Sequence, residues 1–333
     1  MEPLRAEKFQ AHPATAALER LGAAPHPSAA APRVAVLVPC YNEASTVAGV
    51  VKAFQAQLPS ATVYVYDNNS TDGTADQARE AGAVVRKETL QGKGNVIRRM
   101  FADVDADIYV LVDGDGTYDA ASAPKMIDRL LDDDLDMVNA ARDASEGSAY
   151  RLGHRFGNRL LTGIVSRIFG NRLTDMLSGY RVFSRRFAKS FPGLAHGFEI
   201  ETELTVHALE LRLPIAEIRA PYGARPPGSM SKLGTIRDGI RVLWTILVLI
   251  KEERPLPFFS VIAAALAVSS IVLTVPIFIT FMETGQVPRF PTAILATGMM
   301  LLAFLSFACG LILDTVTRGR RELKRLHYLS ISK

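Results

Sequence analysis

The stretch Asp107-Ile-Tyr-Val-Leu-Val-Asp-Gly-Asp-Gly-Thr-Tyr-Asp119 decides the fold. Its apolar, β-branched run from Ile108 to Val112 predicts a short strand buried on both faces, as in a parallel sheet. The run stops at Asp113-Gly-Asp115, so two carboxylates follow the strand's C-terminal end, where open α/β sheets bind their ligands. The glycine lets the backbone turn sharply, and carboxylate oxygens are hard ligands for Mg²⁺ or Mn²⁺. We therefore predict a metal site that can bridge to a diphosphate.

Two other interpretations of Asp113-Gly-Asp115 have to be weighed. Asp-Gly is common in surface turns, so a solvated turn stays open on these residues alone. A calcium-binding loop requires glycine at its sixth position and glutamate at its twelfth, where this chain has Tyr118 and Pro124. The sequence therefore disfavours a calcium-binding loop. The metal–diphosphate site and the simple turn both stay open.

The chain before this stretch repeats one plan, in which an apolar strand is followed by a polar turn and a helix. Strands that alternate with helices predict a parallel α/β sheet. We expect Ser45 to cap the first of these helices, which should end near Gln57. The three repeats are Arg33–Val38 followed by Pro39-Cys-Tyr-Asn-Glu43, Thr62–Tyr66 followed by Asp67-Asn-Asn-Ser-Thr-Asp-Gly73, and a strand near Val84 followed by Gln91-Gly-Lys-Gly-Asn95.

Two common nucleotide-binding folds are excluded by these turns. A dinucleotide-binding fold requires G-x-G-x-x-G after its first strand, and Pro39-Cys-Tyr-Asn-Glu43 contains no glycine. A P-loop requires an earlier glycine and a serine or threonine after its Gly-Lys pair. Here Gly92-Lys93 is followed by Gly94 and preceded by a glycine-free stretch around Glu88.

Composition narrows the class of protein further. The 333 residues are 48% hydrophobic and 22% charged, which is typical of a globular chain, and the length is a soft indication of two domains. Cys40 and Cys309 are the only cysteines, so no disulfide framework or zinc cluster can form, and we expect a reducing compartment. The net charge of +4 suits nucleic acid or anionic lipid. Basic residues beside long apolar runs favour lipid, and we expect no nucleic-acid partner.

The ordered set of turns resembles the donor-binding half of family 2 glycosyltransferases with the GT-A fold. The motifs that carry the resemblance extend from residue 34 to about 235. Two segments further along, Ser178-Gly-Tyr-Arg181 and the segment from Arg225 through Gly228 to Ser231-Lys232, resemble the dolichyl- or polyprenyl-phosphate sugar synthases of that family. The four upstream motifs are Val38-Pro-Cys-Tyr-Asn-Glu43, Asp67-Asn-Asn-Ser-Thr-Asp-Gly73, Gly92-Lys-Gly94 and Asp113-Gly-Asp115.

The resemblance implies roles for individual residues on the donor side. Asp113 is expected to contact the nucleotide sugar and Asp115 to bind the Mg²⁺ or Mn²⁺ cofactor. Arg225 and Lys232 are expected to neutralise the diphosphate. The residues expected to hold the nucleoside are Pro39, Tyr41, Glu43 and Asp67.

On the acceptor side, the resemblance implies that Arg142, Ser178 and Arg181 bind the phosphate of the acceptor. The planar guanidinium of arginine suits that task. The chain departs from the family pattern at two places. Thr117 stands where the dolichyl-phosphate mannose enzymes have glutamine, which leaves the second protein ligand of the metal open. Asn68-Asn69 stands where relatives often have Asp-Gly-Ser after the first aspartate, so base contacts can differ.

Several segments after the predicted sheet have amphipathic patterns. Apolar residues recur every four positions from Tyr150 to Phe169, with arginines between them, which predicts a basic interfacial helix or an ordinary surface helix packed on the core. A second such stripe, around Trp244, predicts an interfacial helix over 235–256. Glu199, Glu201 and Glu203 open another helix, where acids are favoured by the helix dipole, and a functional role is equally open.

Two apolar, uncharged runs, Phe258–Met282 and Thr292–Leu313, are each long enough to cross a hydrocarbon core of about 30 Å. Two very apolar core helices are the alternative. Basic residues flank the outer ends of the pair, which predicts that both chain ends and the catalytic domain face the cytoplasm at the inner membrane of the cell. The flanking residues are Arg237, Arg241, Lys251 and Arg254 before the pair, and Arg318, Arg320, Arg321, Lys324 and Arg325 after it.

We therefore predict five regions: a flexible leader (1–32), a GT-A catalytic domain with a mainly parallel sheet (33–234), an interfacial helix (235–256), a transmembrane hairpin (257–314) and a basic cytoplasmic tail (315–333). The predicted activity is inverting transfer of a sugar from a nucleotide sugar, preferably UDP-linked, to a polyprenyl phosphate. A homo-oligomer is a further expectation, since such hairpins often pack between subunits. Two alternatives are a transferase that builds a polysaccharide or glycolipid on a hydroxyl acceptor, and an inactive nucleotide-sugar-binding membrane scaffold.

Overall fold

The computed structural model describes residues 31–143, 163, 173–195, 197, 199–223, 244, 247–248 and 250–332. The leader up to residue 30, the helix expected over Tyr150–Phe169, apart from Gly163, and most of the helix expected around Trp244 lie outside these ranges. Arg225 and Lys232 lie outside them too.

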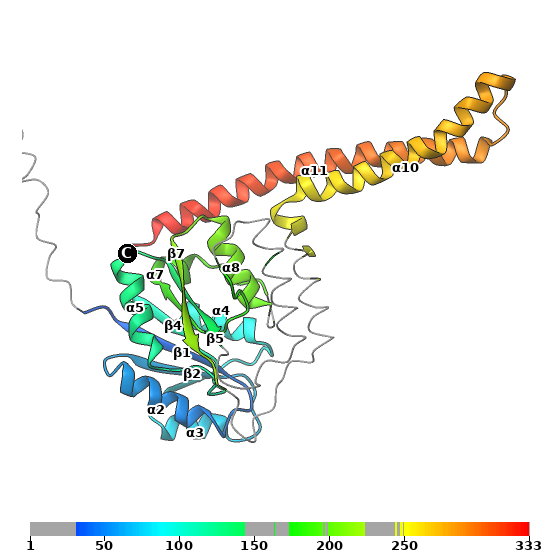
Figure 1. The fold of residues 1–333 in the computed structure, drawn as a ribbon. Coiled ribbons are helices and arrows are strands. Elements are labelled where there is room, and N and C mark those ends of the chain that lie inside the picture. Colours follow the sequence, from blue (N-terminus) through cyan, green and yellow to red (C-terminus); the bar gives the residue numbers. More distant parts are fainter. Residues whose placement is uncertain are drawn as a thin grey trace, which may run out of the picture. The chain divides into compact units, whose positions relative to one another are not determined.

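A seven-stranded sheet forms the centre of the domain, in the order β3-β2-β1-β4-β6-β5-β7 (Figure 1). β1, β2, β3 and β4 are mutually parallel, β5 is parallel to β7, and β6 is antiparallel to both β4 and β5. This confirms the predicted α/β class with a mainly parallel sheet. The strands are β1 (Val34–Cys40), β2 (Thr62–Asp67), β3 (Val84–Lys87), β4 (Ile108–Leu111), β5 (Met137–Asp143), β6 (Arg181–Ser184) and β7 (Ile215–Pro221).

Helices cover both faces of this sheet, because the central strands are apolar on both sides. On β1, Val36 and Val38 join the core beneath α2, α3 and α5, whereas Ala35 and Leu37 join the core beneath α4, α7 and α8. The alternation follows from the two-residue period of a strand. The helices are α2 (Val47–Gln57), α3 (Thr74–Glu80), α4 (Lys93–Asp103), α5 (Ser122–Asp132), α7 (Arg185–Ser190) and α8 (Ile200–Glu210).

The first helix ends at Gln57 as predicted, but Ser45 does not cap it. Its N-cap residue is Thr46, whose side chain makes no capping hydrogen bond. The Thr46 hydroxyl instead donates to the carbonyl of Gly114 at 2.7 Å, in the turn after β4. The Thr46 side chain at the start of α2 therefore binds the turn Asp113-Gly-Asp115, which we name the acidic turn, and not the amides of its own helix.

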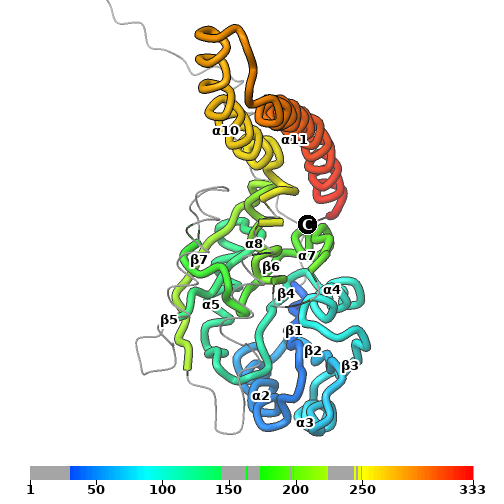
Figure 2. Tube along the Cα trace, turned by 90° about the vertical axis from the view of Figure 1, so that its right-hand side faces the viewer, coloured from blue at the N-terminus to red at the C-terminus, as the bar shows by residue number. Residues whose placement is uncertain are grey.

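Two long helices, α10 (Pro255–Thr284) and α11 (Phe290–Ser330), form the predicted C-terminal hairpin and lie side by side (Figure 1 and Figure 2). Both are long and apolar enough to cross a membrane. Few of their side chains are buried, so the alternative of two core helices does not fit. These features indicate membrane association. The segment 315–330, predicted as a basic tail, is a continuation of α11.

Residues at seven-residue intervals, all of them small except Ile277, line the contact between the two helices. The Ser270 hydroxyl donates to the Ala296 carbonyl at 2.7 Å, and a Cβ added at Gly310 would lie 3.0 Å from the Cβ of Phe259. Close approach of helix backbones through small side chains is typical of packing in membranes. The buried positions are Ala263, Ser270 and Ile277 on α10 and Ala296, Ala303, Gly310 and Thr317 on α11.

Candidate active site

The turn after β4 places Asp113 and Asp115 at the C-terminal edge of the sheet, as the sequence predicted. Gly114 between them has no room for a side chain, because an added Cβ would lie 2.6 Å from the sulfur of Cys40. Gly116 has a φ of 71°, a conformation that favours glycine. The two glycines let the acidic turn lie directly over the end of β1.

The Asp115 carboxylate is buried and bound by Thr117. Its Oδ1 accepts hydrogen bonds from the Thr117 hydroxyl at 2.6 Å and from the Thr117 amide at 3.1 Å. The residue that replaces the family's glutamine thus orients the aspartate. Within the described ranges, no group of three His, Cys, Asp or Glu side chains could hold a metal ion. Mg²⁺ is commonly bound by one or two carboxylates together with substrate phosphates, and this donor set fits that arrangement.

The Asp113 carboxylate lies against Lys93 of the Gly92-Lys-Gly94 motif, a residue for which the sequence predicted no individual role. The Nζ of Lys93, the first residue of α4, lies 2.5 Å from Asp113 Oδ1 and 2.5 Å from Glu201 Oε1 on α8. The side chains of Lys93 and Glu201 are only 9% and 7% exposed. The signal that could have indicated a role for Lys93 was its position between two glycines, where the turn after β3 leads into α4.

The electrostatics of this cluster keep its lysine charged. Burial acts to lower the pKa of Lys93, but the carboxylates of Asp113 and Glu201 outweigh it, and the pKa is raised well above its usual value. Burial raises the pKa of Glu201, and the Lys93 charge opposes that shift. Of the three glutamates that open the helix, Glu201 therefore belongs to the site. Glu199 and Glu203 accept hydrogen bonds from nearby backbone amides.

The unusual Asn68-Asn69 pair holds the loop that presents Lys93. The Oδ1 of Asn68 accepts from the Gly92 amide at 2.7 Å, and its Nδ2 donates to the Glu88 carbonyl at 2.9 Å. Asn69 adopts a φ of 64° and donates to the Thr89 carbonyl at 2.9 Å. The departure from the family pattern at these two positions fixes the loop between β3 and α4.

The Ser178–Arg181 segment approaches Asp113 through its backbone. A Cβ added at Gly179 would overlap the Asp113 carboxylate, and the Gly179 amide donates to the Tyr118 hydroxyl at 2.9 Å. β6 lies between β4 and β5 in the sheet, and this brings a segment more than sixty residues away to the acidic turn. Asp113 is therefore held between a lysine and a glycine backbone.

Arg181 and Ser178 are fully buried, and this does not fit the expectation that they bind a phosphate directly. The Arg181 guanidinium donates to the Ser178 carbonyl at 3.1 Å, to the Met176 carbonyl at 2.6 Å and to the Thr205 hydroxyl at 2.9 Å. Burial lowers its pKa to about 10. The reason for the discrepancy is that the segment turns inward, so Arg181 ties the Ser178 loop to α8.

Arg142 at the end of β5 is paired with Asp175. Its Nε lies 2.7 Å from Asp175 Oδ2 and its Nη2 lies 2.9 Å from Oδ1, and the guanidinium also covers the ring of Tyr222 at 5.6 Å. Bidentate pairing of this kind orients the guanidinium strongly. The structure therefore places Arg142 in a fixed position between Asp175 and Tyr222.

The residues expected to hold a nucleoside gather at the ends of β1 and β2. Pairing of Cys40 with Asp67 brings the two turns together. Tyr41 is 40% exposed, whereas Glu43 and Asp67 are buried, and Asp67 accepts from the Ser70 amide at 3.3 Å. Pro39 lies on β1, within the same edge. The structure thus places these four residues at one edge of the sheet.

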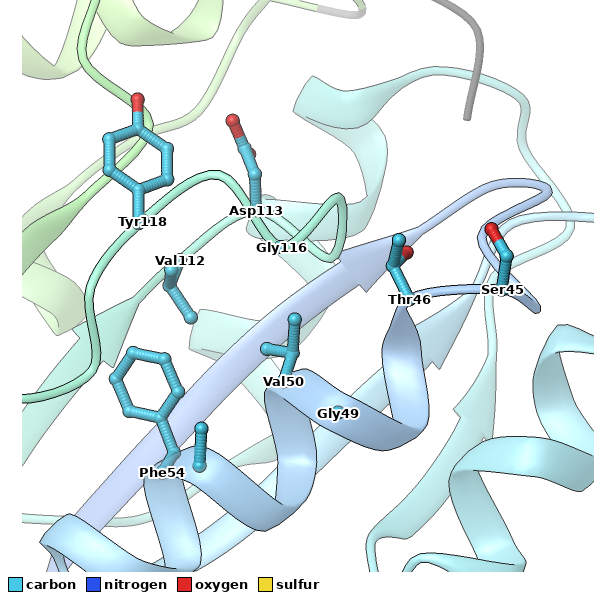
Figure 3. A pocket seen from close by; sticks show the side chains of 10 residues that line it. Ser45, Thr46, Gly49, Val50, Phe54, Val112, Asp113, Gly116 and Tyr118 are labelled. Atoms are coloured by element: carbon cyan, nitrogen blue, oxygen red, sulfur yellow. The ribbon is translucent and has the colours of Figure 1, made fainter. Parts of the chain in front are cut away.

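A cavity of about 260 Å³ lies between α2 and the acidic turn. Figure 3 shows Val50 and Phe54 on α2 pointing towards Val112, with Asp113 and Tyr118 beyond it. The walls of the cavity are mainly apolar, and Asp113 lies at the border of the cavity. The lining residues are Ser45, Thr46, Gly49, Val50, Ala53, Phe54, Val112, Asp113, Gly116 and Tyr118.

Comparison with known proteins agrees with this architecture. The model of the family described as "Glycosyl transferase family 2" matches residues 35–191. The chain is 32% identical to glycosyltransferase AglJ of Haloferax volcanii over 300 residues, which cover 89% of this chain and 98% of that protein. It is 26% identical to the dolichyl-phosphate hexose transferase of the same organism over 227 residues, which cover 66% of this chain and 95% of that protein.

Among solved structures, glucosyl-3-phosphoglycerate synthase of Mycobacterium tuberculosis, in complex with Mn²⁺, uridine diphosphate and glucosyl-3-phosphoglycerate, is similar in fold. The TM-score is 0.55 at 22% identity, over 66% of this chain and 80% of that one. The fold, the acidic turn and a relative matched over nearly its whole length lead to one conclusion. The chain belongs to glycosyl transferase family 2, and its catalytic domain has the GT-A fold.

Proposed function

We propose that this glycosyltransferase moves a sugar from a UDP-linked donor to a polyprenyl phosphate at the membrane surface, with inversion at the anomeric carbon. The observation that carries the proposal is that one chain joins a GT-A domain to an apolar hairpin whose basic end binds the domain through Glu210, Arg321 and Lys324. An enzyme built in this way is suited to an acceptor that is itself embedded in lipid. The dolichyl-phosphate hexose transferase among the relatives supports this acceptor class.

On the donor side, we assign the nucleoside to the edge formed by Pro39, Tyr41, Glu43 and Asp67. Asp115 is the ligand for a divalent cation, Mg²⁺ or Mn²⁺, which would offset charge on the departing diphosphate. A solved structure of similar fold contains Mn²⁺ and uridine diphosphate, which supports both the cation and the preference for uridine. Arg225 and Lys232, outside the described residues, keep their proposed role at the diphosphate.

Asp113 is the proposed contact for the transferred sugar. Lys93 holds its Oδ1 and the backbone of Gly179 packs against the same carboxylate, so Asp113 has little freedom to rotate. A group held in this way is pre-organised, and no reorganisation is needed when the donor binds.

On the acceptor side, the nucleophile is a phosphate oxygen. Its new bond to the anomeric carbon forms as the bond to the nucleoside diphosphate breaks on the opposite face of the sugar. A phosphate monoester has a second pKa of about 6, so it is already ionised near neutral pH, and the reaction requires no general base. Arg142, held by Asp175, is the cation we assign to guide the phosphate. Ser178 and Arg181 act indirectly, by supporting the loop beside Asp113.

We also propose an orientation in the membrane. Arg318, Arg320 and Arg325 lie on α11 beyond its apolar run, and cationic residues collect on the cytoplasmic side of membrane proteins. The catalytic domain and both chain ends would then lie in the cytoplasm, at the inner membrane. The apolar outer faces of α10 and α11 offer a surface on which copies of the chain can associate.

The test is a panel of donors with a short polyprenyl phosphate in detergent. UDP-linked hexoses, uronates and amino sugars and GDP-mannose are offered with Mg²⁺ or Mn²⁺, and the products are extracted and identified by mass spectrometry. The expected product is a polyprenyl phosphate that carries the transferred sugar. Transferred sugar found in free oligosaccharide would favour a hydroxyl acceptor. Binding of the donor without turnover on any lipid phosphate would favour an inactive binding scaffold.

A further inference from the structure

A buried cluster of charges joins the catalytic domain to the membrane hairpin. Glu210 is the last residue of α8, and its side chain is only 2% exposed. The Nζ of Lys324 lies 2.8 Å from Glu210 Oε2, and the Nε of Arg321 lies 3.3 Å from Oε1. Both cations belong to the extension of α11 beyond its apolar run. The extension is thus ion-paired to a helix of the catalytic domain.

The segment just before α10 binds the same two cations. The Oε1 of Glu253 lies 3.5 Å from Lys324 Nζ, and its Oε2 lies 3.7 Å from an Arg321 nitrogen. Arg321 also donates to the Glu253 carbonyl, and Thr317 donates to the Glu252 carbonyl at 3.0 Å. We name Glu210, Glu253, Arg321 and Lys324 the junction cluster. It connects α8 to both helices of the hairpin at once.

A second attachment lies further along α11. The Tyr328 hydroxyl donates to Asp136 Oδ2 at 2.8 Å, and Arg186 donates to the Ile331 carbonyl at 3.0 Å. The Arg186 guanidinium also lies over the Tyr328 ring at 5.6 Å. Two separated attachments prevent rotation about either one. The hairpin and the catalytic domain are therefore held in one relative orientation.

The chemistry of the junction cluster suits orientation better than stability. Burial raises the pKa of Glu210, and the neighbouring Glu253 raises it further, while Lys324 opposes both effects. Arg320, whose side chain is 44% exposed, adds a third cation 3.8 Å from Glu253 Oε1, so every carboxylate of the cluster has a cation. Desolvation of the buried charges offsets much of the attraction between them. Such pairs contribute little net stability, and they form only in one geometry. A cluster of this kind therefore fixes the orientation of the hairpin relative to the catalytic domain.

We infer that Glu210 is a positioning residue, which acts through Arg321 and Lys324 to hold the active site at a fixed height and angle above the bilayer. The inference rests on the proposed lipid acceptor. α8 begins beside the active site, where Glu201 binds Lys93, and ends at the junction cluster. The helix fixed to the hairpin is thus the one whose Glu201 binds the lysine that holds Asp113. A misplacement of about 1 Å at a reacting centre can lower a rate a hundredfold.

The experiment compares two acceptors for the purified full chain. One is a long-chain polyprenyl phosphate in phospholipid vesicles that also contain the enzyme, and the other is a short-chain polyprenyl phosphate dispersed in detergent. The variants are Glu210→Gln and the double change Arg321→Gln with Lys324→Gln. Glu322→Gln, at an exposed position of the same helix, is the matched control. Thermal unfolding of each variant in detergent shows whether it is folded.

The expected result is a loss of about tenfold or more in turnover on the vesicle acceptor, with the detergent rate within about twofold of wild type. The charge-exchanged variant, Glu210→Lys combined with Lys324→Glu, should recover part of the vesicle activity, because it restores the ion pair with its charges exchanged. A loss confined to the vesicle assay is the result that a merely structural role would not predict. Equal losses in both assays, or no loss in either, would overturn the inference. A wild-type chain that transfers to neither lipid would overturn the proposed acceptor, and this inference with it.

Discussion

Helix α8 has a buried glutamate near each end, and the two have different charge surroundings. Glu201 shares the single ammonium of Lys93 with Asp113, so two carboxylates meet one cation. Glu210 and Glu253 share Arg321 and Lys324, and Arg320 also lies 3.8 Å from Glu253, so two carboxylates meet three cations. Both clusters are held tightly, but only the first has more carboxylates than cations.

This difference separates an active site from a structural joint. A cluster in which every buried carboxylate has a cation is complete within the protein. The cluster around Asp113 has an excess of negative charge next to Asp115, which a cationic ligand can complement. Substitutions near the start of α8, where Glu201 meets Lys93, should therefore lower the catalytic rate. Substitutions near the end of α8, where Glu210 meets α11, should change the orientation of the catalytic domain relative to the hairpin.

The largest effect is expected at Asp115. The Asp115→Asn variant keeps the shape and the hydrogen bonds to Thr117 but removes the charge that we propose binds a divalent cation. Loss of several kcal/mol of transition-state stabilisation corresponds to a loss of about a thousandfold in kcat. Single-turnover transfer at saturating donor is the measurement. Wild-type turnover in the variant, with metal still required, would show that the cation binds elsewhere.

The second-largest effect on turnover is expected at Lys93. The Lys93→Met variant leaves Asp113 and Glu201 without their shared cation, and an uncompensated buried charge costs about 3–5 kcal/mol of stability. We expect kcat to fall about a hundredfold as Asp113 turns away. Lys52→Met, at an exposed position of α2, is the control.

The double variant Lys93→Met with Glu201→Gln tests the charge argument itself. It removes one cation and one carboxylate, so the stability lost in the single variant should largely return, while kcat stays low. Chemical denaturation in detergent and initial rates measure the two quantities. A double variant as unstable as Lys93→Met would show that packing, and not charge, gives Lys93 its importance.

A substitution at Gly179 moves Asp113 without changing any charge. An alanine Cβ there would overlap the Asp113 carboxylate, so the carboxylate has to shift. We expect kcat/KM to fall about tenfold, with little change in the unfolding temperature. Gly223→Ala is the control, because its Cβ would meet its nearest neighbour, the Thr117 carbonyl, at an ordinary 3.8 Å. Equal activity of the two variants would mean that Asp113 has more freedom than the structure indicates.

Local patterns in the sequence predicted the parts of this site that depend on neighbours along the chain. The strand Ile108–Leu111, the carboxylates after it and the turns at Pro39 and Asp67 each follow from a few adjacent residues. The order of these turns was sufficient to indicate the family and the fold. The two apolar helices were equally clear, because an uncharged apolar run of about twenty residues is typical of a membrane-spanning helix.

The parts that could not be predicted depend on contacts between distant segments. Lys93 and Glu201 are far apart in sequence and meet only because α4 and α8 cover the same face of the sheet. Arg181 was expected to face a phosphate, but Thr205 on α8 and the Met176 carbonyl bind it in the interior. Arg321 and Lys324 were expected in a basic tail, and Glu210 pairs with them. In each case a charged residue has a partner that its own neighbours do not indicate.

The smallest predicted effect concerns His207, which lies between the two ends of α8. It is buried against Phe187 and Phe191, and its Nε2 lies 3.4 Å from the Ser190 hydroxyl. Burial, with a further contribution from the charge of Lys324, lowers its pKa from 6.5 to about 3. The unfolded chain therefore binds a proton at this residue between these pH values, while the folded chain does not. Stability contributed by the neutral ring is present above pH 6.5 and is lost as the pH falls towards 3.

This loss amounts to about 2 kcal/mol at about pH 5. Glu201 and Glu210, whose pKa values are raised, shift stability in the opposite direction, so wild type alone is not informative. The measurement is the difference in unfolding free energy between His207→Leu and wild type, taken at neutral pH and again at pH 5. Because leucine cannot bind a proton, the variant should gain about 2 kcal/mol relative to wild type on acidification. A difference that is the same at both pH values would mean that water reaches the ring, and that α8 is less tightly packed between its two charged ends than the structure indicates.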